Sequence, residues 1–374
     1  MELSEIREQI SQVDDQLLPL FLRRMELSAR VAAYKKEAGM PVYDGARERK
    51  ILARVSERSG DMAEYARLLY SGIMQLSRAY QIQLLTDENA FSLPAADENG
   101  FPHAARVACQ GVEGAYSQAA ADRAFRFADI VYQDSFEDVF EAVESGEVRF
   151  GVLPIENSAH GSVTKVYDLM RSHSFFIVRS VKLHVRHHLL AKKGAELPDI
   201  RVILSHEQAL GQCSRFLKSL PGVKTRVCAN TAMAAREVAA SGDPAMAAIS
   251  SESCAAQYGL NVLKSQIQNT DNNYTRFICI SKNLEIYPGA NRTSLMMTLP
   301  HEQGSLYRML SRFYALGINL NKLESRPIPE REFEFMFYFD LDTPVYSPNL
   351  IKLIGELQET CEFFQYLGSY SEEV

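Results

Sequence analysis

Apolar residues recur at helical spacing through the first 85 positions. From Ser4 toward Glu37 the stripe consists of Ile6, Ile10, Val13, Leu17, Leu20, Leu27 and Val31, which predicts one long helix. Asp44 is a suitable N-cap for a second helix through Val55, and residues 63–84 predict a third. Pro19 lies inside the first helix, so we expect a kink near Asp15.

The first predicted helix is too long for a three-helix domain of its own. At 1.5 Å per residue it extends roughly 50 Å, against ~30 Å for the diameter of a small domain. Most of its apolar stripe therefore has no partner within three helices. We expect a second copy of the chain to cover the stripe, in a homodimer or higher homo-oligomer.

Residues 104–282 alternate short apolar runs with helical patterns, which favours an α/β fold. The first runs lie at 107–108, 130–131 and 150–153. An extended stretch over 176–190 crosses to a second alternation, with runs at 202–204, 225–227 and 247–249. Two α/β lobes follow from this pattern, in the manner of periplasmic binding proteins. The cleft between two such lobes is a usual place for a small-molecule site.

The last segment has the pattern strand (294–299), helix (306–316), strand (318–325), strand (333–341), helix (350–359), strand (361–367). This β-α-β-β-α-β order is that of the ferredoxin-like α+β fold. An apolar ladder is expected on one face of the fourth element, from Phe333, Phe335, Phe337, Phe339 and Leu341. Polar breaks then predict an all-helical domain (1–88), a linker (89–103), a two-lobed domain (104–282) and a C-terminal domain (283–374).

Composition narrows the class of protein. The chain has 374 residues, of which 46% are hydrophobic and 23% charged, and these values exclude a disordered chain. A net charge of −7 provides no basic field for nucleic acid, so local arginines must bind any anion. The acidic N-terminus and the lack of a long apolar span predict neither a signal peptide nor a membrane partner. Six scattered cysteines predict a reduced, cytoplasmic protein without disulfides or zinc, and we expect no cofactor.

Polar residues on the striped helices carry the first candidate chemistry. A single helical charge is usually a solvated one, but a whole set stands in a fixed order: Arg7, Arg24, Lys35, Asp44, Arg47, Glu48, Ser77 and Gln81. This set resembles the all-helical chorismate mutases over residues 1 to about 85. A helix cap and an ordinary helix-face serine explain Asp44 and Ser77 equally well.

The resemblance implies that Arg24, Arg47 and Arg7 of the partner subunit hold the two carboxylates of chorismate. It further implies that Lys35 and Gln81 donate to the ether oxygen, while Glu48 takes the hydroxyl. The rearrangement to prephenate is intramolecular and needs no nucleophile. Conformational restriction and fixed donors are therefore the available means of catalysis, and bidentate arginine suits carboxylates.

Four stretches of the two-lobed segment carry the second candidate chemistry: residues 111–117, 154–163, 205–213 and 273–277. In the first and second stretches, small residues and hydroxyls follow predicted strands, where backbone N–H groups can bind an anion, although turns and caps give similar strings. Together they resemble the prephenate dehydratases, most specifically through Thr275-Arg276-Phe277 and the run from Glu156 to Ser162. The resemblance implies that Thr275 assists departure of the ring hydroxyl as carbon dioxide leaves. It places Glu156, Asn157, Ser205 and Gln212 along the cleft and pairs Arg276 with a carboxylate.

Two features of this segment stand apart from that resemblance. Glu207 occupies a position where the family commonly has proline, and its charge beside His206 is expected to alter the loop. His160, His187 and His188 have no carboxylate at a suitable spacing, so we expect surface or packing roles for them rather than acid–base catalysis.

Two short strings in the last segment resemble the phenylalanine-binding ACT domains: Gly304-Ser305-Leu306 at a helix start, and Glu324-Ser325-Arg326-Pro327 at a strand end. The helix start offers N–H donors to an amino-acid carboxylate, and Leu306 offers apolar contact. A turn cap and a strand terminator would give the same strings in a purely structural module.

All three resemblances stand in one order. Over nearly its full length the chain resembles the P-protein family, the bifunctional chorismate mutase/prephenate dehydratases with phenylalanine feedback through a C-terminal ACT domain. This implies chorismate and prephenate as substrates and phenylalanine as effector. Two alternatives remain open: a two-lobed solute-binding or sensor protein without catalysis, and a dehydratase that uses arogenate.

Overall fold

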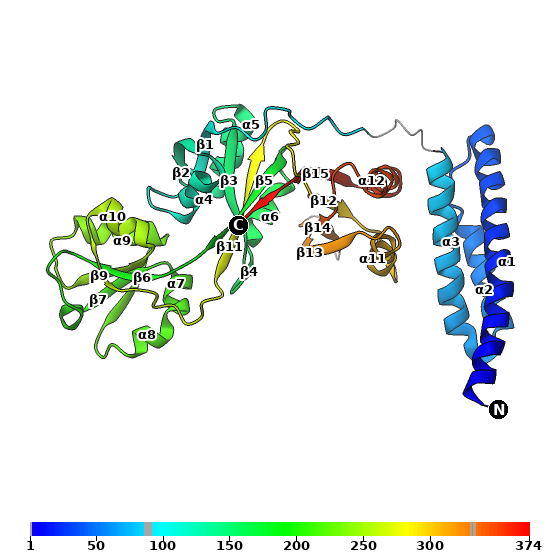
Figure 1. Ribbon diagram of the computed structural model, residues 1–374, viewed down its shortest axis with the longest axis horizontal. Coiled ribbons are helices and arrows are strands. Elements are labelled where there is room, and N and C mark those ends of the chain that lie inside the picture. The colour runs from blue at the N-terminus through cyan, green and yellow to red at the C-terminus, as the bar shows by residue number, and fades with distance from the viewer. Residues whose placement is uncertain (1, 86–91, 330, 332–333) are drawn as a thin grey trace. The chain divides into compact units, whose positions relative to one another are not determined.

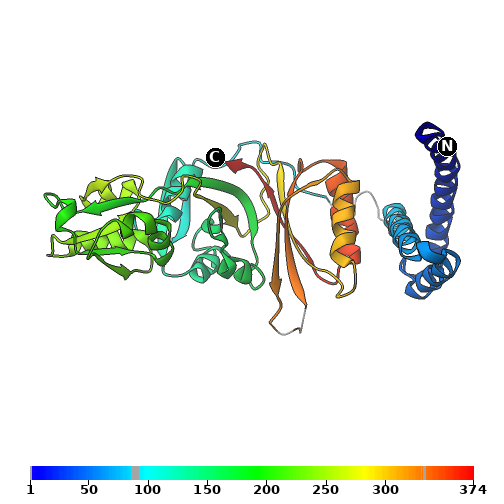
Figure 2. The same cartoon turned by 90° about the horizontal axis from the view of Figure 1, so that it is seen from below.

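The computed structural model describes residues 2–85, 92–329, 331 and 334–374, without the side chains of 359 and 360 (Figures 1 and 2). Part of the predicted linker, residues 89–91, and Phe333 of the predicted ladder lie outside the described residues. The chain divides into two compact units. One comprises Met1–Leu93, Met297–Asn319 and Tyr346–Phe364; the other comprises Pro94–Met296, Leu320–Val345 and Gln365–Val374.

The three helices predicted for the N-terminal segment are present: α1 (Leu3–Ala38), α2 (Gly45–Arg58) and α3 (Ala63–Leu85), with a 3-10 turn at Gly60–Met62. Asp44 caps α2, accepting a hydrogen bond from the Arg47 amide at 2.9 Å. Gly39 ends α1 in the left-handed region, with φ 61°. Helix α1 continues through Pro19, so the proline removes one hydrogen bond without ending the helix.

The first lobe is a mixed sheet in the order β16-β5-β11-β3-β1-β2, with β4 paired to β3. Its strands are β1 (Ala104–Gln110), β2 (Phe127–Gln133), β3 (Phe150–Asn157), β4 (Gly161–Ser162), β5 (Phe176–His184), β11 (Tyr274–Ser281) and β16 (Glu372–Glu373). Its helices are α4 (Tyr116–Ala124), α5 (Phe136–Ser145) and α6 (Thr164–Met170). Strand β11, which the hydrophobic pattern did not predict, returns from the second lobe to lie between β3 and β5.

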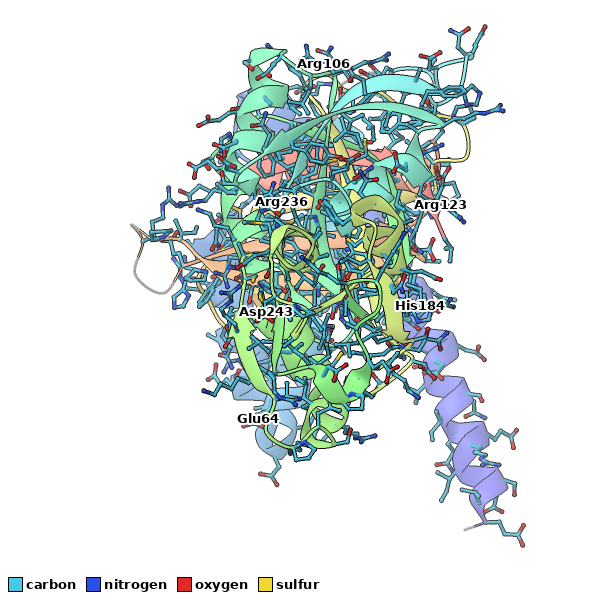
Figure 3. All side chains as sticks on the ribbon, turned by 90° about the vertical axis from the view of Figure 1, so that its left-hand side faces the viewer. Glu64, Arg106, Arg123, His184, Arg236 and Asp243 are labelled. Atoms are coloured by element: carbon cyan, nitrogen blue, oxygen red, sulfur yellow. The ribbon has the colours of Figure 1, made fainter. Side chains whose placement is uncertain are left out.

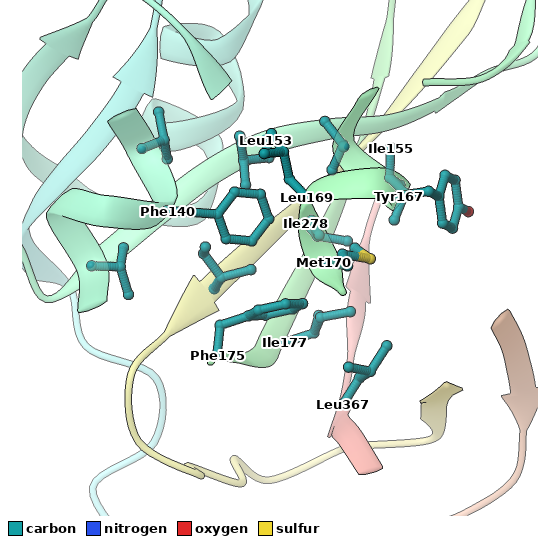
Figure 4. Close-up of a cluster of buried hydrophobic side chains, with 14 of the residues drawn as sticks. Phe140, Leu153, Ile155, Tyr167, Leu169, Met170, Phe175, Ile177, Ile278 and Leu367 are labelled. Carbon is teal, nitrogen blue, oxygen red and sulfur yellow. The ribbon is translucent and has the colours of Figure 1, made fainter. Parts of the chain in front are cut away.

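Alternating residues of this sheet supply two hydrophobic cores. On one face, Val107 and Val152 pack with helix α4 around Ala120 and Ala121. On the other, Leu153 and Ile278 pack with α5 and α6, in the cluster around Phe140, Tyr167, Met170 and Phe175 shown in Figure 4. The sheet is therefore covered on both sides.

The second lobe is a five-stranded sheet in the order β10-β6-β9-β7-β8. Its strands are β6 (His188–Ala191), β7 (Val202–Ser205), β8 (Lys224–Val227), β9 (Met246–Ser250) and β10 (Asn261–Lys264). A 3-10 turn (Leu197–Asp199) and helices α7 (Glu207–Gln212), α8 (Ser214–Lys218), α9 (Thr231–Ala240) and α10 (Glu252–Tyr258) surround it. The prediction of two α/β lobes is confirmed. The sequence pattern also missed α10 and β10.

The C-terminal segment has the predicted element order: β12 (Arg292–Thr298), α11 (Ser305–Ala315), β13 (Asn319–Pro327), β14 (Phe335–Asp342), α12 (Pro348–Thr360) and β15 (Phe364–Tyr370). The sheet order is β13-β14-β12-β15. The rings of Phe335, Phe337 and Phe339 follow one another at 6.4 and 6.3 Å, as the ladder predicted.

Strand β14 has a second buried face that the ladder did not indicate. Met336 and Tyr338 belong to the core of the first lobe, where the Tyr338 hydroxyl donates to the carbonyl of Tyr167 at 2.6 Å. The tyrosine rings meet edge to face, with centroids 5.0 Å apart. No helix among the described residues has the length and apolarity needed to cross a membrane.

Candidate functional site

Strands β3 and β11 bring the two most specific motifs of the two-lobed segment side by side. The antiparallel register pairs Thr275 with Asn157 and Arg276 with Glu156. The register then shifts between Arg276 and Phe277, so that Ile155 is an extra residue on β3, as in a β-bulge. Because residues that pair directly across two strands lie on the same face, Asn157 and Thr275 share one face of the sheet. Glu156 and Arg276 share the other.

The amide of Asn157 holds Thr275 in place. Its Nδ2 donates to Thr275 Oγ1 at 2.9 Å and to Asn273 Oδ1 at 2.9 Å, while its Oδ1 accepts from the Ala159 amide at 3.0 Å. The hydroxyl of Thr275 accepts this hydrogen bond, so its own proton remains directed elsewhere and available for donation. This geometry is what a hydrogen-bond donor to a leaving group requires.

Gln212, the last residue of α7 in the second lobe, extends this cluster across to the other lobe. Its Oε1 accepts from Asn273 Nδ2 at 3.2 Å and lies 2.6 Å from His187 Nε2. Its Nε2 lies 3.0 Å from His160 Nδ1, in the turn after β3. We call the six residues Asn157, His160, His187, Gln212, Asn273 and Thr275 the amide cluster.

The amide cluster lies where the two lobes are joined. His187 belongs to the segment from β5 to β6 and Asn273 to the segment from β10 to β11. Backbone hydrogen bonds tie these segments together, from the Val185 amide to the Asn273 carbonyl at 2.7 Å and from the Ile267 amide to the His187 carbonyl at 2.9 Å. Polar groups that converge between two lobes are the usual form of a small-molecule site.

Three predicted site residues, Ser205, Glu156 and Arg276, lie outside the amide cluster. Ser205 is fully buried, and its hydroxyl donates to the Ile249 carbonyl at 2.6 Å. Glu156 and Arg276 lie on the face opposite Thr275, because successive residues of a strand alternate faces, and Arg276 pairs with Asp340 of β14 and, at 3.3 Å, with Glu156. Burial acts to lower the pKa of Arg276, but the charge of Asp340 holds that pKa well above its ordinary value.

Sequence reasoning missed three members of the amide cluster. Asn273 stands two residues before Thr275, and residues two apart share a face of a strand, so the spacing was a usable signal. His160 and His187 were assigned surface or packing roles because no carboxylate stands at a suitable spacing, whereas in the structure both contact the amide of Gln212. Burial lowers the pKa of His187, while its bond to Gln212 opposes this effect. Glu207 is exposed in the first turn of α7, next to the capping residue His206.

The helical segment brings only part of its predicted set together. Arg24 on α1 donates through Nη1 to the hydroxyl of Ser77 on α3 and, at 3.4 Å, to the Ile73 carbonyl. Burial lowers the pKa of Arg24. One turn further along α3, Gln81 is buried, and its Oε1 has no partner among the described residues.

The other predicted residues of this set lie around that core. Lys35 Nζ donates to the Val42 carbonyl at 2.6 Å. Glu48 pairs at 3.1 Å with Arg78, which sequence reasoning missed, and burial raises the pKa of Glu48 against the charge of Arg78. The side chains of Arg7 and Arg47 are exposed.

The predicted effector residues belong to the two different compact units. Gly304 is the N-cap of α11, with φ 82°. The Ser305 hydroxyl accepts a hydrogen bond from Arg308 at 2.9 Å, and Leu306 is the second residue of the helix. On β13, Glu324 accepts from the Ser162 hydroxyl at 2.5 Å, and Arg326 makes two hydrogen bonds to Asp168 at 2.8 and 2.9 Å. The intervening Ser325 and the following Pro327 are exposed.

Charge elsewhere on the two-lobed segment is mixed in sign. Exposed Arg106, Arg236 and Asp243, labelled in Figure 3, are examples. In the described part of the chain, no three His, Cys, Asp or Glu residues gather closely enough to hold a metal ion. The six cysteines, all described, are free thiols.

Comparison with known proteins identifies both segments. The family model for chorismate mutase type II matches residues 6–82, and that for prephenate dehydratase matches residues 107–285. The bifunctional chorismate mutase/prephenate dehydratase of Escherichia coli (strain K12) is 33% identical, with 99% of this chain and 96% of that protein covered.

Two further relatives each match 71% of this chain. Arogenate dehydratase/prephenate dehydratase 2 of Arabidopsis thaliana is 40% identical, with 71% of this chain and 72% of that protein covered. A prephenate dehydratase from Arthrobacter aurescens, solved in complex with L-Phe, is 29% identical with a TM-score of 0.64, covering 71% of this chain and 90% of that one. The chain therefore belongs to the bifunctional chorismate mutase/prephenate dehydratases, with a helical mutase part and a two-lobed dehydratase part.

Proposed function

We propose that this enzyme converts chorismate to prephenate in its helical part and prephenate to phenylpyruvate in its two-lobed part, under feedback by phenylalanine. The observation that carries the second step is the amide cluster, which fixes Thr275 beside Asn157 and reaches Gln212 across the lobes. A reduced cytoplasmic location stays a prediction from the sequence.

In the dehydratase site, Thr275 assists the departing ring hydroxyl while the carboxylate of prephenate leaves as carbon dioxide. Formation of the aromatic ring drives the reaction, so the site needs little more than a donor to the leaving oxygen. A threonine is a weak acid in water, but a preorganised donor in a water-poor site stabilises developing charge well. Asn157, Asn273 and Gln212 supply that preorganisation through their mutual hydrogen bonds.

In the mutase site, Arg24, Arg47 and Arg7 of the partner subunit hold the carboxylates, while Lys35 and Gln81 donate to the ether oxygen. Glu48 takes the substrate hydroxyl, and Ser77 orients Arg24. Two features support these roles: the buried contact between Arg24 and Ser77, and the buried Gln81 beside it. Asp44 acts through its cap on α2, which fixes the start of the helix that carries Arg47 and Glu48.

A second copy of the chain completes the mutase site and makes the enzyme a homodimer or a higher homo-oligomer. The support is the apolar face of α1, where Ile10, Val13, Leu17 and Leu20 are each more than half exposed. An apolar stripe of this length on one helix is typical of an interaction surface.

The C-terminal segment is proposed to be a ferredoxin-like ACT domain that binds phenylalanine. Its element order and the central position of β12 and β14 favour this fold, and the relative solved with L-Phe favours this ligand. The effector residues are those predicted from the sequence: Gly304, Ser305, Leu306, Glu324, Ser325, Arg326 and Pro327.

One assay tests the pathway. Chorismate supplied to the purified chain should yield phenylpyruvate, and phenylalanine should lower that rate and raise the unfolding temperature, because a ligand that binds only the folded state stabilises it. Arogenate should be compared on the same preparation, since a relative carries both dehydratase names. Prephenate as the final product, with no phenylpyruvate formed, would contradict the proposal.

A further inference from the structure

A group of charged side chains lies directly behind Thr275 and Asn157, on the opposite face of the same strands. Arg276 of β11 forms an ion pair with Asp340 of β14, and both side chains are only 11% exposed. Arg276 also lies 3.3 Å from Glu156 of β3, which in turn lies 3.4 Å from the Nζ of Lys322 on β13. We call Glu156, Arg276, Lys322, Glu324 and Asp340 the charge cluster.

The charge cluster also holds the turn that follows Asn157. Lys322 Nζ donates to Ser162 Oγ at 2.9 Å, and that hydroxyl donates to Glu324 Oε2 at 2.5 Å. Ser162 lies on β4, where it pairs with Glu156, while the preceding Gly161 pairs with Asn157. Strand β13 therefore holds the turn between β3 and β4 through Ser162. Asn157 and His160 belong to the same turn.

Asp340 is itself rigidly placed. Its Oδ1 accepts from the Ser294 hydroxyl of β12 at 2.6 Å, and that hydroxyl lies 2.7 Å from the Tyr370 hydroxyl of β15. Strands β12, β14 and β15 therefore all contribute, through these contacts, to the position of Arg276. The C-terminal sheet therefore contacts β3 and β11 through Glu156 and Arg276. Each of these residues is next in sequence to Asn157 or Thr275, the candidate catalytic pair.

Stability alone does not explain a charge cluster at this place. Moving charges out of water costs about as much as their attraction returns, so well-packed apolar residues would stabilise the contact equally well. What buried ion pairs do provide is one defined geometry. Because consecutive Cα atoms are a fixed ~3.8 Å apart, a displacement of Arg276 or Glu156 displaces Thr275 or Asn157 with it.

We propose that Glu156 and Arg276 are positioning residues for Asn157 and Thr275, and that Asp340 and Lys322 couple them to the C-terminal sheet. This inference rests on the proposed phenylalanine feedback. Glu324, a predicted effector residue, is part of the charge cluster, so a ligand that draws Glu324 away releases Ser162 and the Asn157 loop. Coupling of this kind is reciprocal, so prephenate binding must weaken phenylalanine binding by the same factor.

The test is Asp340→Asn in the full-length chain, which keeps the size of the side chain and removes its charge. We expect the dehydratase kcat to fall about 10-fold with little change in KM, because the catalytic pair is misplaced rather than removed. The concentration of phenylalanine that halves the rate should rise by about 5-fold or more, the lower range of allosteric coupling. Asp340→Glu should restore part of both properties.

The matched control is Asp342→Asn, on the same strand with an exposed side chain. It should keep wild-type kcat and inhibition, and chorismate mutase activity should be unchanged in every variant. Lys322→Gln is a second variant, and it leaves the Arg276–Asp340 pair intact. It should weaken inhibition by phenylalanine by a larger factor than it lowers the dehydratase kcat.

The outcomes separate the two proposals. If phenylalanine does not inhibit the wild type, the feedback proposal fails, and the kcat of Asp340→Asn alone decides whether Arg276 is a positioning residue. If the wild type is inhibited, but Asp340→Asn and Lys322→Gln both keep its kcat and its inhibition, the coupling proposal is overturned.

Discussion

The helical and two-lobed parts of this enzyme bury their apolar residues in opposite ways. Of the 36 residues of α1, only Ser28 and Ala32 are buried, and a row of large apolar side chains faces outward. In the two-lobed part, Val107, Ala108 and Cys109 of β1 are all inaccessible to solvent, between helices on both faces of the sheet. The helical part therefore leaves an apolar face exposed, whereas the two-lobed part covers its apolar strands within a single chain.

The two candidate sites differ in the same way. The amide cluster is assembled from one chain, and each member is hydrogen-bonded to another. In the helical part, Arg24 and Ser77 are in contact, but Arg7 and Arg47 are exposed. The proposed mutase site therefore depends on a second copy of the chain, whereas every member of the amide cluster lies in one chain.

The largest effect is expected from Thr275→Ala. Loss of the hydroxyl removes the donor to the leaving oxygen and should lower the dehydratase kcat by about 10²-fold or more, the usual contribution of a positioned proton donor. Chorismate mutase activity, measured on the same sample, should not change. Thr225→Ala, at an exposed position of β8, is the matched control. Normal phenylpyruvate formation by Thr275→Ala would refute the site.

A smaller effect, confined to the other activity, is expected from Leu17→Glu. A charge in the middle of the exposed α1 stripe should oppose its burial against a second copy, since an unpaired buried charge costs several kcal/mol. Light scattering should show a smaller assembly, and mutase activity should fall about 10-fold or more at a fixed low concentration. Dehydratase activity should stay within about two-fold. Glu8→Gln on the same helix serves as control, and equal loss of both activities would contradict the comparison.

The smallest effect is expected on the pH dependence of stability, through His187. Burial lowers the pKa of His187 below its ordinary value of 6.5, so the folded chain holds this ring neutral where the unfolded chain protonates it. The contribution of His187 to the free energy of unfolding is therefore fully present above pH 6.5 and is lost as the pH falls. In His187→Gln, the urea midpoint should decline less steeply between about pH 7.5 and 5.5. His103→Gln, at an exposed site, should keep the wild-type slope, and identical slopes in all three proteins would disprove this role.

Local pattern predicted what depends on local spacing. The three N-terminal helices, the two alternations and the final β-α-β-β-α-β order all follow from apolar periodicity. The partner subunit inferred from the length of α1 stays a prediction. The pattern could not predict β11, because its pairing between β3 and β5 depends on the chain returning from the other lobe.

The candidate site shows the same limit at the level of single residues. Thr275, Asn157 and Gln212 were found through motifs, and they do come together. Glu156 and Arg276 lie on the opposite face because successive residues of a strand alternate. The sequence pattern had assigned neither motif to a strand, so this alternation was not applied to them. Asp340, the partner of Arg276, comes from a separate segment and was inconspicuous inside an apolar strand.

Subunit mixing tests the central claim most directly. Arg7→Ala and Arg24→Ala chains should each lack mutase activity, yet their mixture should regain about a quarter of the wild-type level, because half the dimers then contain one intact site of two. A mixture of Thr275→Ala and Gln212→Ala chains should regain no dehydratase activity beyond the average of the two. Failure of the first mixture to recover activity, after exchange of subunits has been verified, or recovery by the second, would contradict the account.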